Sequence, residues 1–283
     1  MQTIAIATDF SETSAHAARY AASLSSQLGA KRLILYHSFD DTPISTEVPV
    51  PEKSAEDLEL ARESSLLGLE VIAAQIRPLL AVHTRVDQVA NDLPLFLGIE
   101  RLVEEQDVDF VVAGMTGKTG IANFFVGSNT IGLAETCPAP LLIVPHEANF
   151  EPIKSAIFAC DLKKVDKTTP VSFLSELVTK LGVTLHVLNV ERPNTRFNPD
   201  MIPEQFKLHG LLDNLGPEYH YIEHPDVAEG IMEFTESQKA GLVITLPRKY
   251  GFFQSLFHRS VTKRLAHHTR VPLLVLRSEN DME

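Results

Sequence analysis

The sequence predicts an α/β protein built from two tandem domains, each containing a doubly wound parallel sheet. Three observations support this fold class. The chain of 283 residues has about twice the length of a typical domain of roughly 150 residues. Short apolar runs alternate with segments of helical spacing, which is the pattern of successive strand–helix–strand units. Finally, the second half repeats the pattern of the first, with similar sequences at its start and its end.

In the first half, five apolar runs have the length and composition of strands, at residues 3–8, 33–36, 81–86, 108–113 and 141–144. Helical spacing lies between them at residues 14–28, 54–77 and 93–106, and a further helix is expected to begin at Gly127 and Ser128. Gly29 ends the first helix, and an acidic loop with prolines follows the second strand. Because helices connect successive strands, the strands should pair in parallel with helices on both faces.

The second half has the same order of elements. Strands are expected at residues 155–160, 184–190, 219–223, 242–245 and 273–276. Pro170 is well placed in the first turn of a helix that ends before Gly182, and further helices follow at residues 203–212 and after Pro225. Residues 6–10 align with 158–162, and residues 137–144 align with 269–276. We therefore expect domains at residues 1–147 and 152–278, the second being shorter in its middle.

The composition excludes several classes of protein. With 44% hydrophobic and 22% charged residues, the chain is not disordered. Two Cys are too few for a fold that disulfides hold together, which excludes a disulfide-rich protein. No apolar stretch approaches the roughly 18 residues of a membrane span, which argues against a transmembrane helix. The first residues, MQTIAIATDF, lack the features of a signal peptide, so we expect a cytoplasmic protein with no membrane partner. The net charge of −12 argues against a nucleic-acid partner.

A glycine-rich segment follows the fourth strand of the first half and indicates a phosphate site. Gly114 and Gly117 are separated by two residues, and nine more residues lead to Gly127 and Ser128. Glycine lets the backbone approach an anion, and the free N–H groups at a helix start attract phosphate. Ligands of open α/β sheets bind beyond the carboxyl ends of the strands, where Asp9 also lies, directly after the first strand.

Simpler interpretations of these residues stay open. A glycine-rich loop after a strand can be only a turn, and an Asp before a helix is often only an N-cap. The segment Gly117-Lys118-Thr119 looks like the end of a Walker A loop, but that motif needs a glycine where Val112 stands. We therefore reject a Walker A site.

With these motifs, the chain is similar to tandem universal stress proteins over both halves, residues 1–278. The resemblance rests on the spacing of the glycines and Ser128, on Asp9 within Thr8-Asp-Phe-Ser11, and on the Cys-Pro-Ala-Pro-Leu-Leu-Ile-Val run that ends at Val144. It implies a Rossmann-like fold of the adenine nucleotide alpha hydrolase type that binds ATP. The implied binding residues are Asp9 at the adenosine, the backbone near Ser38 at the adenine, and Gly114, Gly117, Gly127, Ser128 and Asn129 around the phosphates and ribose.

The same resemblance suggests how the domains are arranged, because dimers of this family often pair their last strands. Residues 141–144 and 273–276 are short apolar segments, each of which would otherwise leave an exposed apolar edge. We expect them to pair antiparallel about a pseudo-two-fold axis, so that the chain forms an intramolecular pseudo-dimer. A further homodimer is left open.

The second half lacks the glycine pattern. Under the alignment of the domain ends, Gly114 corresponds to Leu246, Gly117 to Lys249 and Gly127 to Arg259, whereas Ser128 stays a serine, Ser260. We therefore expect one nucleotide per chain, in the first half. The loop is basic instead, which is typical of a solvated face, although side chains alone could also bind an anion. Its basic residues and nearby histidines are Arg248, Lys249, His258, Arg259, Lys263, Arg264, His267 and His268.

Other reactive residues carry no predicted chemistry. Nothing in the sequence around Cys137 or Cys160 indicates a reactive thiol. The histidines show no ligand spacing typical of a zinc site, so we predict no metal site.

Three functions are consistent with the sequence. The first is a stress-response protein that binds ATP in its first domain and acts as a sensor or partner-binding module. The second is a slow ATPase that uses Asp9 or a nearby carboxylate with Mg²⁺. The third is an interaction scaffold without bound nucleotide. The first is preferred, because we recognise none of the grouped catalytic residues that fast phosphoryl transfer requires, and we assign no catalytic residue.

Overall fold

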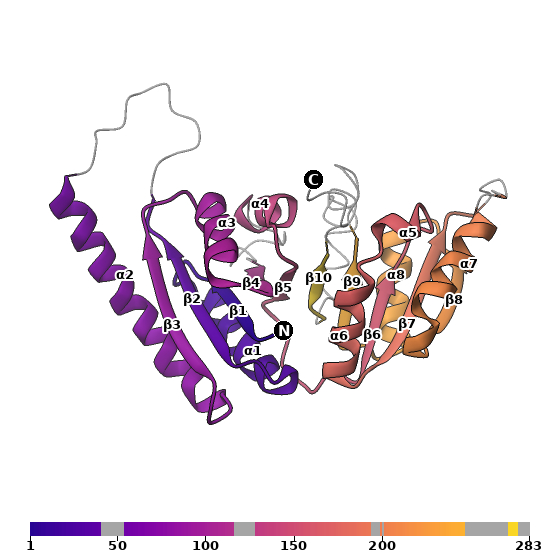
Figure 1. Cartoon of the computed structure of the whole chain (residues 1–283), viewed down its shortest axis with the longest axis horizontal. Helices are drawn as coiled ribbons and strands as arrows, with labels where there is room; N and C mark the ends of the chain where they lie inside the picture. The colour runs from indigo at the N-terminus through magenta and orange to yellow at the C-terminus, as the bar shows by residue number, and fades with distance from the viewer. Residues whose placement is uncertain (41–53, 116–127, 194–198, 200, 247–270, 277–283) are drawn as a thin grey trace, which may run out of the picture.

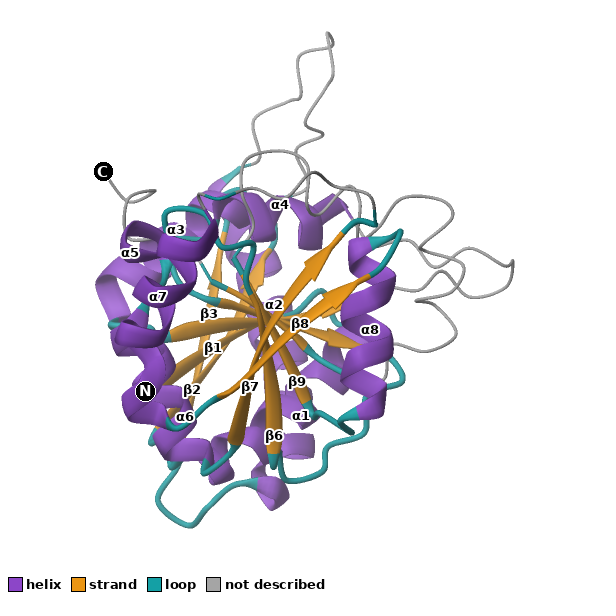
Figure 2. Ribbon diagram, turned by 90° about the vertical axis from the view of Figure 1, so that its right-hand side faces the viewer, coloured by secondary structure: helices purple, strands orange, loops and turns teal. Residues whose placement is uncertain are grey.

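The computed structural model describes residues 1–40, 54–115, 128–193, 199, 201–246 and 271–276. Two α/β halves lie on either side of β5 and β10, the strands at the centre of Figure 1. Together they form one ten-stranded sheet with the order β3-β2-β1-β4-β5-β10-β9-β6-β7-β8. Helices cover both faces of this twisted sheet, as Figure 2 shows.

The elements of the first half alternate as the sequence predicts. The strands are β1 (Thr3–Ala7), β2 (Arg32–Ser38), β3 (Arg85–Asn91), β4 (Phe110–Met115) and β5 (Leu141–Pro145). The helices are α1 (Glu12–Leu28), α2 (Ala55–Ile76), α3 (Leu95–Gln106) and α4 (Ser128–Thr136), with a 3₁₀ turn at Arg77–Leu79. Ser11 caps α1 by accepting a hydrogen bond from Ser14 N, and Gly29 ends it at φ 65°.

Up to its fourth strand, and again at its last, the described part of the second half follows the same order, with one addition. Its strands are β6 (Ser155–Ala159), β7 (Thr184–Glu191), β8 (Glu218–Glu223), β9 (Leu242–Thr245) and β10 (Leu273–Val275). Its helices are α5 (Val165–Thr168), α6 (Val171–Leu181), α7 (Met201–Leu212) and α8 (Val227–Ser237), with a 3₁₀ turn at Asp213–Leu215. The single turn α5 was not predicted, because one helical turn is too short to produce a periodic pattern.

The third strand was predicted in the wrong place. The sequence analysis put it at residues 81–86, whereas β3 spans Arg85–Asn91. Val82, which supplied part of the apolar signal, lies in the turn before the strand with 94% of its surface exposed. β3 is an edge strand that pairs with β2. Val86 and Ala90 pack against the core on one face and Val89 against the core on the other, but all three are only partly buried, so the mixed sequence of β3 gives a weak strand signal.

The two halves join through their last strands. All pairs within each half are parallel, but β5 and β10 pair antiparallel, with Leu142 opposite Leu274. This confirms the antiparallel pairing expected from the two apolar segments. Each strand covers the edge that the other would expose, so the sheet continues through the junction without an open apolar edge there.

The hydrophobic cores on the two faces of the sheet differ in whether helices of both halves contribute to one cluster. On one face, α1 and α2 of the first half and α6 and α7 of the second contribute to a single buried cluster, which includes Leu24, Leu142, Leu177 and Leu274. On the other face, α3 and α4 pack on one cluster and α8 on another. The halves therefore share a hydrophobic core on one face. On the other face their helices pack on different clusters, although Val275 of β10 belongs to the cluster of the first half. Among the described helices, none has the length and apolarity needed to cross a bilayer.

Candidate functional site

The first half reverses its strand order between β1 and β4. The chain moves from β1 outward through β2 and β3, then returns to place β4 on the other side of β1, with Ile6 opposite Val112. At such a reversal the connections leave in opposite directions, which opens a crevice beyond the carboxyl ends of the two strands. Asp9 follows β1 and Gly114 lies near the end of β4, so the structure brings both to this edge.

Asp9 lies in a tight turn between β1 and α1. Its Oδ1 accepts a hydrogen bond from Ser11 N at 3.0 Å, and the residue between them, Phe10, has a positive φ of 64°. Burial raises the pKa of Asp9, but hydrogen bonds from the side chain and backbone of Ser11, from the side chain of Ser14 and from the backbone of Asp9 together outweigh this and hold the pKa below its ordinary value. Asp9 is exposed, so an ionised carboxylate lies at the surface beyond the carboxyl end of β1.

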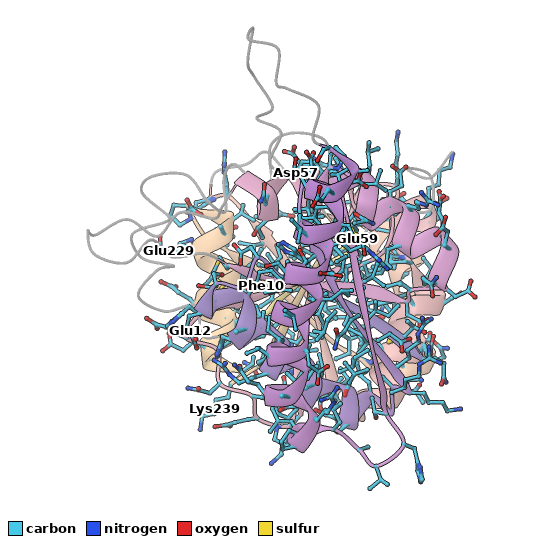
Figure 3. All side chains as sticks on the ribbon, turned by 90° about the vertical axis from the view of Figure 1, so that its left-hand side faces the viewer. Phe10, Glu12, Asp57, Glu59, Glu229 and Lys239 are labelled. Carbon is cyan, nitrogen blue, oxygen red and sulfur yellow. The ribbon has the colours of Figure 1, made fainter. Side chains whose placement is uncertain are left out.

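Two aromatic residues that the sequence analysis missed support this turn. The ring of Phe10 lies 4.2 Å from that of His37, measured between centroids, and His37 Nδ1 is 2.8 Å from Thr8 O. On its other side Phe10 meets Gly68 of α2, where a Cβ would come within 2.7 Å of the ring. Figure 3 labels Phe10 beside this long helix. The position of His37, at the end of the neighbouring parallel strand, is the signal that could have identified it.

Ser38 has a structural task in this arrangement. Its Oγ donates a hydrogen bond to Leu93 O at 2.6 Å, which ties the end of β2 to the segment before α3. In the next residue, Phe39 N donates to Asn91 O at 3.0 Å. The hydroxyl of Ser38 is therefore used in a hydrogen bond within the protein. A ligand at this strand end would bind to backbone groups.

Gly114 is required by close packing at the same edge. A Cβ at this position would lie 2.7 Å from Thr13 O and 3.1 Å from Thr13 Cγ2, so no larger residue fits without movement of α1. Gly114 O also accepts a hydrogen bond from Thr130 Oγ1 at 3.0 Å, which ties the first turn of α4 to the end of β4. The sequence analysis assigned Gly114 to phosphate binding, which stays a prediction, and the structure shows that this residue also packs closely between β4 and α1.

The remaining predicted residues divide into two groups. In the described residues helix α4 covers Ser128–Thr136, and Asn129 on it is exposed. The predicted helix start at Gly127 and Ser128 stays a prediction, because the residues before Ser128 lie outside the described part of the chain. Gly117 and Gly127 lie outside the described residues. The structure therefore places Asp9, Ser38, Gly114 and the start of α4 at the carboxyl ends of β1, β2 and β4.

The second half repeats the Asp turn in detail. Lys163 N donates to Asp161 Oδ1 at 3.2 Å, and Leu162 has a φ of 53°, matching the position and geometry of Phe10. Asn189 takes the place of His37, with its Nδ2 donating to Cys160 O at 2.9 Å. The turn therefore belongs to the fold, and the carboxylate at its corner is present with or without the glycine pattern.

The end of β9 differs from the end of β4. Ala113 pairs with Ile143, and Thr245 pairs with Val275, so the two strand ends are equivalent and Leu246 occupies the position of Gly114. Leu246 packs against the shared core. Lys249, Arg259, Ser260 and the other basic residues of this loop lie outside the described residues.

Comparison with known proteins agrees with the duplicated architecture. The sequence profile of the Universal stress protein family matches residues 1–145 and 154–277. No curated protein matches the chain. A universal stress protein from Archaeoglobus fulgidus DSM 4304 is similar in structure, with a TM-score of 0.70, 17% identity and coverage of 97% of this chain and 98% of that one.

Two proteins from Pseudomonas aeruginosa have the same overall fold. One, from strain UCBPP-PA14, is described as a putative universal stress protein and has a TM-score of 0.61, 12% identity and coverage of 100% and 95%. The other, from strain PAO1, is described as functionally unknown and has a TM-score of 0.60, 12% identity and coverage of 100% and 94%. At these identities the likeness concerns the fold. The family is shown by the two profile matches, which cover nearly the whole chain, and the chain therefore belongs to the universal stress protein family, with two copies of its domain in tandem.

Proposed function

We propose that this chain is a cytoplasmic stress-response protein that binds ATP in its first domain, residues 1–147, and acts as a sensor or partner-binding module. The second domain, residues 152–278, binds no nucleotide in this proposal. The observation that carries the proposal is the junction at Gly114. Through Thr13 and Thr130, this residue holds the start of α1 and the start of α4 together, beside the crevice at the strand-order reversal.

The charges at this edge suit the two ends of a nucleotide. The sequence predicts a helix start at Gly127 and Ser128, and the first N–H groups of a helix, together with the positive end of its dipole, favour phosphate. Asp9 is held ionised, so it repels phosphate and accepts hydrogen bonds from hydroxyl or N–H donors. A nucleotide with its phosphates toward α4 and its ribose toward Asp9 satisfies both groups.

The same groups favour binding over rapid hydrolysis. Phosphoryl transfer needs a placed cation, a group that orients water and groups that neutralise developing charge. Asp9 supplies one carboxylate that can hold Mg²⁺, but its Oδ1 already accepts from Ser11 N. We therefore expect ATP turnover to be slow or absent.

The first test is nucleotide content. One sample of protein purified without added nucleotide is extracted with acid, and the extract is analysed for ATP and ADP. A second, intact sample is titrated with ATP and assayed for ATP turnover with Mg²⁺. We expect retained ATP, a stoichiometry near one per chain and little turnover. Retained ADP with measurable turnover would instead favour the ATPase. No retained nucleotide and no binding would favour the scaffold, and a stoichiometry near two would contradict the assignment to the first domain.

The second test is a substitution copied from the second domain. Gly127→Arg introduces the residue that the alignment places there, Arg259, and should abolish ATP binding without unfolding the protein. Gly210→Arg is the matched control, because this exposed glycine of α7 has open space around the Cβ position and lies in the other domain. Unchanged ATP affinity in Gly127→Arg, measured by calorimetry, would place the nucleotide elsewhere.

A further inference from the structure

Three side chains with metal-binding groups meet on β7 and β8, near the amino ends of these strands. His186 of β7 is paired in register with Glu218 of β8, and His220 follows Glu218 by two residues. Because side chains alternate between the faces of a strand, all three point to the same face of the sheet. The cluster lies at the opposite end of the strands from the proposed nucleotide site and in the other domain.

The donor atoms form a compact triangle. His186 Nδ1 lies 3.1 Å from His220 Nε2 and 3.3 Å from Glu218 Oε2, and the last two atoms are 3.7 Å apart. Zinc binds imidazole nitrogen and carboxylate oxygen at about 2.0–2.2 Å in tetrahedral geometry, which places neighbouring ligand atoms about 3.2–3.6 Å apart. The three distances in the protein are close to this range, so an ion could bind with small side-chain adjustments.

Neighbouring side chains pack around the two imidazoles, whereas the side of the cluster formed by Glu218 is open to solvent. His186 is 6% exposed, and Phe234 of α8 packs against both rings, with its centroid 4.7 Å from that of His220 and 6.3 Å from that of His186. The side chain of Glu218 is 59% exposed, so water can reach the cluster from its side.

We propose that His186 Nδ1, His220 Nε2 and Glu218 Oε2 bind one Zn²⁺ ion, with water in the fourth position. Two imidazoles and one carboxylate suit zinc, whereas Mg²⁺ and Ca²⁺ take mainly oxygen ligands. The bound ion would cross-link β8, the edge strand of the second domain, to β7. The site shares no residue with the proposed nucleotide site, so either proposal can fail without the other.

Sequence spacing gave no sign of this site, and the sequence analysis predicted no metal. The ligands come from two strands, and Glu218 follows His186 by 32 positions along the chain. Only the register of β7 against β8 brings them together. Within the part of the chain that the structure describes, this is the one group of three such side chains with donor atoms close enough to share an ion.

The test is zinc binding by the full-length protein without an affinity tag or nucleotide. The protein is stripped with a chelator and titrated with Zn²⁺ by calorimetry, and with Co²⁺ as a probe whose visible absorption reports the coordination geometry. We expect one ion per chain and an intense Co²⁺ band typical of four-coordination. Glu218→Gln and His220→Asn should each weaken Zn²⁺ binding at least tenfold and reduce the Co²⁺ band.

Two matched controls separate ligand loss from general effects. Glu223→Gln changes an exposed carboxylate at the other end of β8, and His83→Asn changes an exposed histidine of the first domain. Both should bind Zn²⁺ within twofold of the unmodified protein. Circular dichroism of each metal-free variant checks folding, and the exposed Glu218 makes Glu218→Gln the variant least affected by packing. No saturable binding, or equal binding by Glu218→Gln and His220→Asn, would overturn the proposal.

Discussion

The side-chain amide of Gln27 forms two hydrogen bonds with the backbone of Ile153. Gln27 Oε1 accepts from Ile153 N at 2.9 Å, and Gln27 Nε2 donates to Ile153 O at 2.7 Å. Nε2 also donates to Leu181 O at 3.1 Å, at the end of α6. One residue near the end of α1 therefore fixes the segment that leads into the second domain.

Replacing Gln27 with alanine tests the strength of this link. We expect Gln27→Ala to lower the free energy of unfolding by about 1–3 kcal/mol, because partly buried backbone groups at Ile153 lose their partners. Urea unfolding measures the change. Gln75→Ala, at an exposed site on α2, serves as control and should stay within about 0.5 kcal/mol of the unmodified protein. Equal stability of the two variants would show that the link contributes nothing.

Gly114→Ala tests the packing between β4 and α1. The added Cβ would lie 2.7 Å from Thr13 O, so we expect a loss of about 1–3 kcal/mol in stability and weaker ATP binding as the strand end shifts. Thermal unfolding and ATP titration measure the two effects. Gly210→Ala is the matched control in open space, where alanine should raise the stability of α7 by about 0.5–1 kcal/mol. A Gly114→Ala protein with unchanged stability would mean that the edge accommodates a side chain.

Leu274→Ala tests the shared core at the domain junction. Leu274 is 3% exposed and pairs with Leu142 across the antiparallel contact, so we expect a loss of about 2–5 kcal/mol in unfolding free energy. Leu67→Ala removes the same atoms from a residue of α2 that is 71% exposed, and should cost little. Denaturant unfolding of both variants gives the comparison. If the two losses were equal, the junction would not contribute to the cooperative core.

The pKa of Asp9 predicts a dependence of stability on pH. Because the folded-state pKa is below the ordinary value, the ionised carboxylate stabilises the folded protein at neutral pH, and this contribution is lost as the pH falls through the folded-state pKa. A carboxyl-carbon NMR titration should place the midpoint of Asp9 below that of an Asp in an unstructured peptide. In Ser11→Ala, which removes a hydroxyl donor, the midpoint should rise. A midpoint at or above the ordinary value in the unmodified protein would contradict the prediction.

Local features of the sequence determined most of the fold. The order of strands and helices, the end of α1 at Gly29 and the repeat follow from apolar periodicity, glycine geometry and similarity between the halves, which are properties of neighbouring residues. The pairing of β5 with β10 was expected because both are short apolar segments that must be covered. β3 was misplaced because an edge strand needs few apolar residues.

Contacts between distant residues were decided only by the tertiary structure. The sequence marks Gly114 as special, but only the approach of Thr13 shows that packing already requires a glycine there. His37 reaches the Asp9 turn because β2 lies beside β1, and His186 meets His220 because β7 and β8 pair in one register. Register depends on how the whole sheet buries its faces, and a shift of one residue would turn each side chain to the other side. Sequence spacing therefore identifies sites within one segment, whereas sites shared between strands appear only after the sheet has formed.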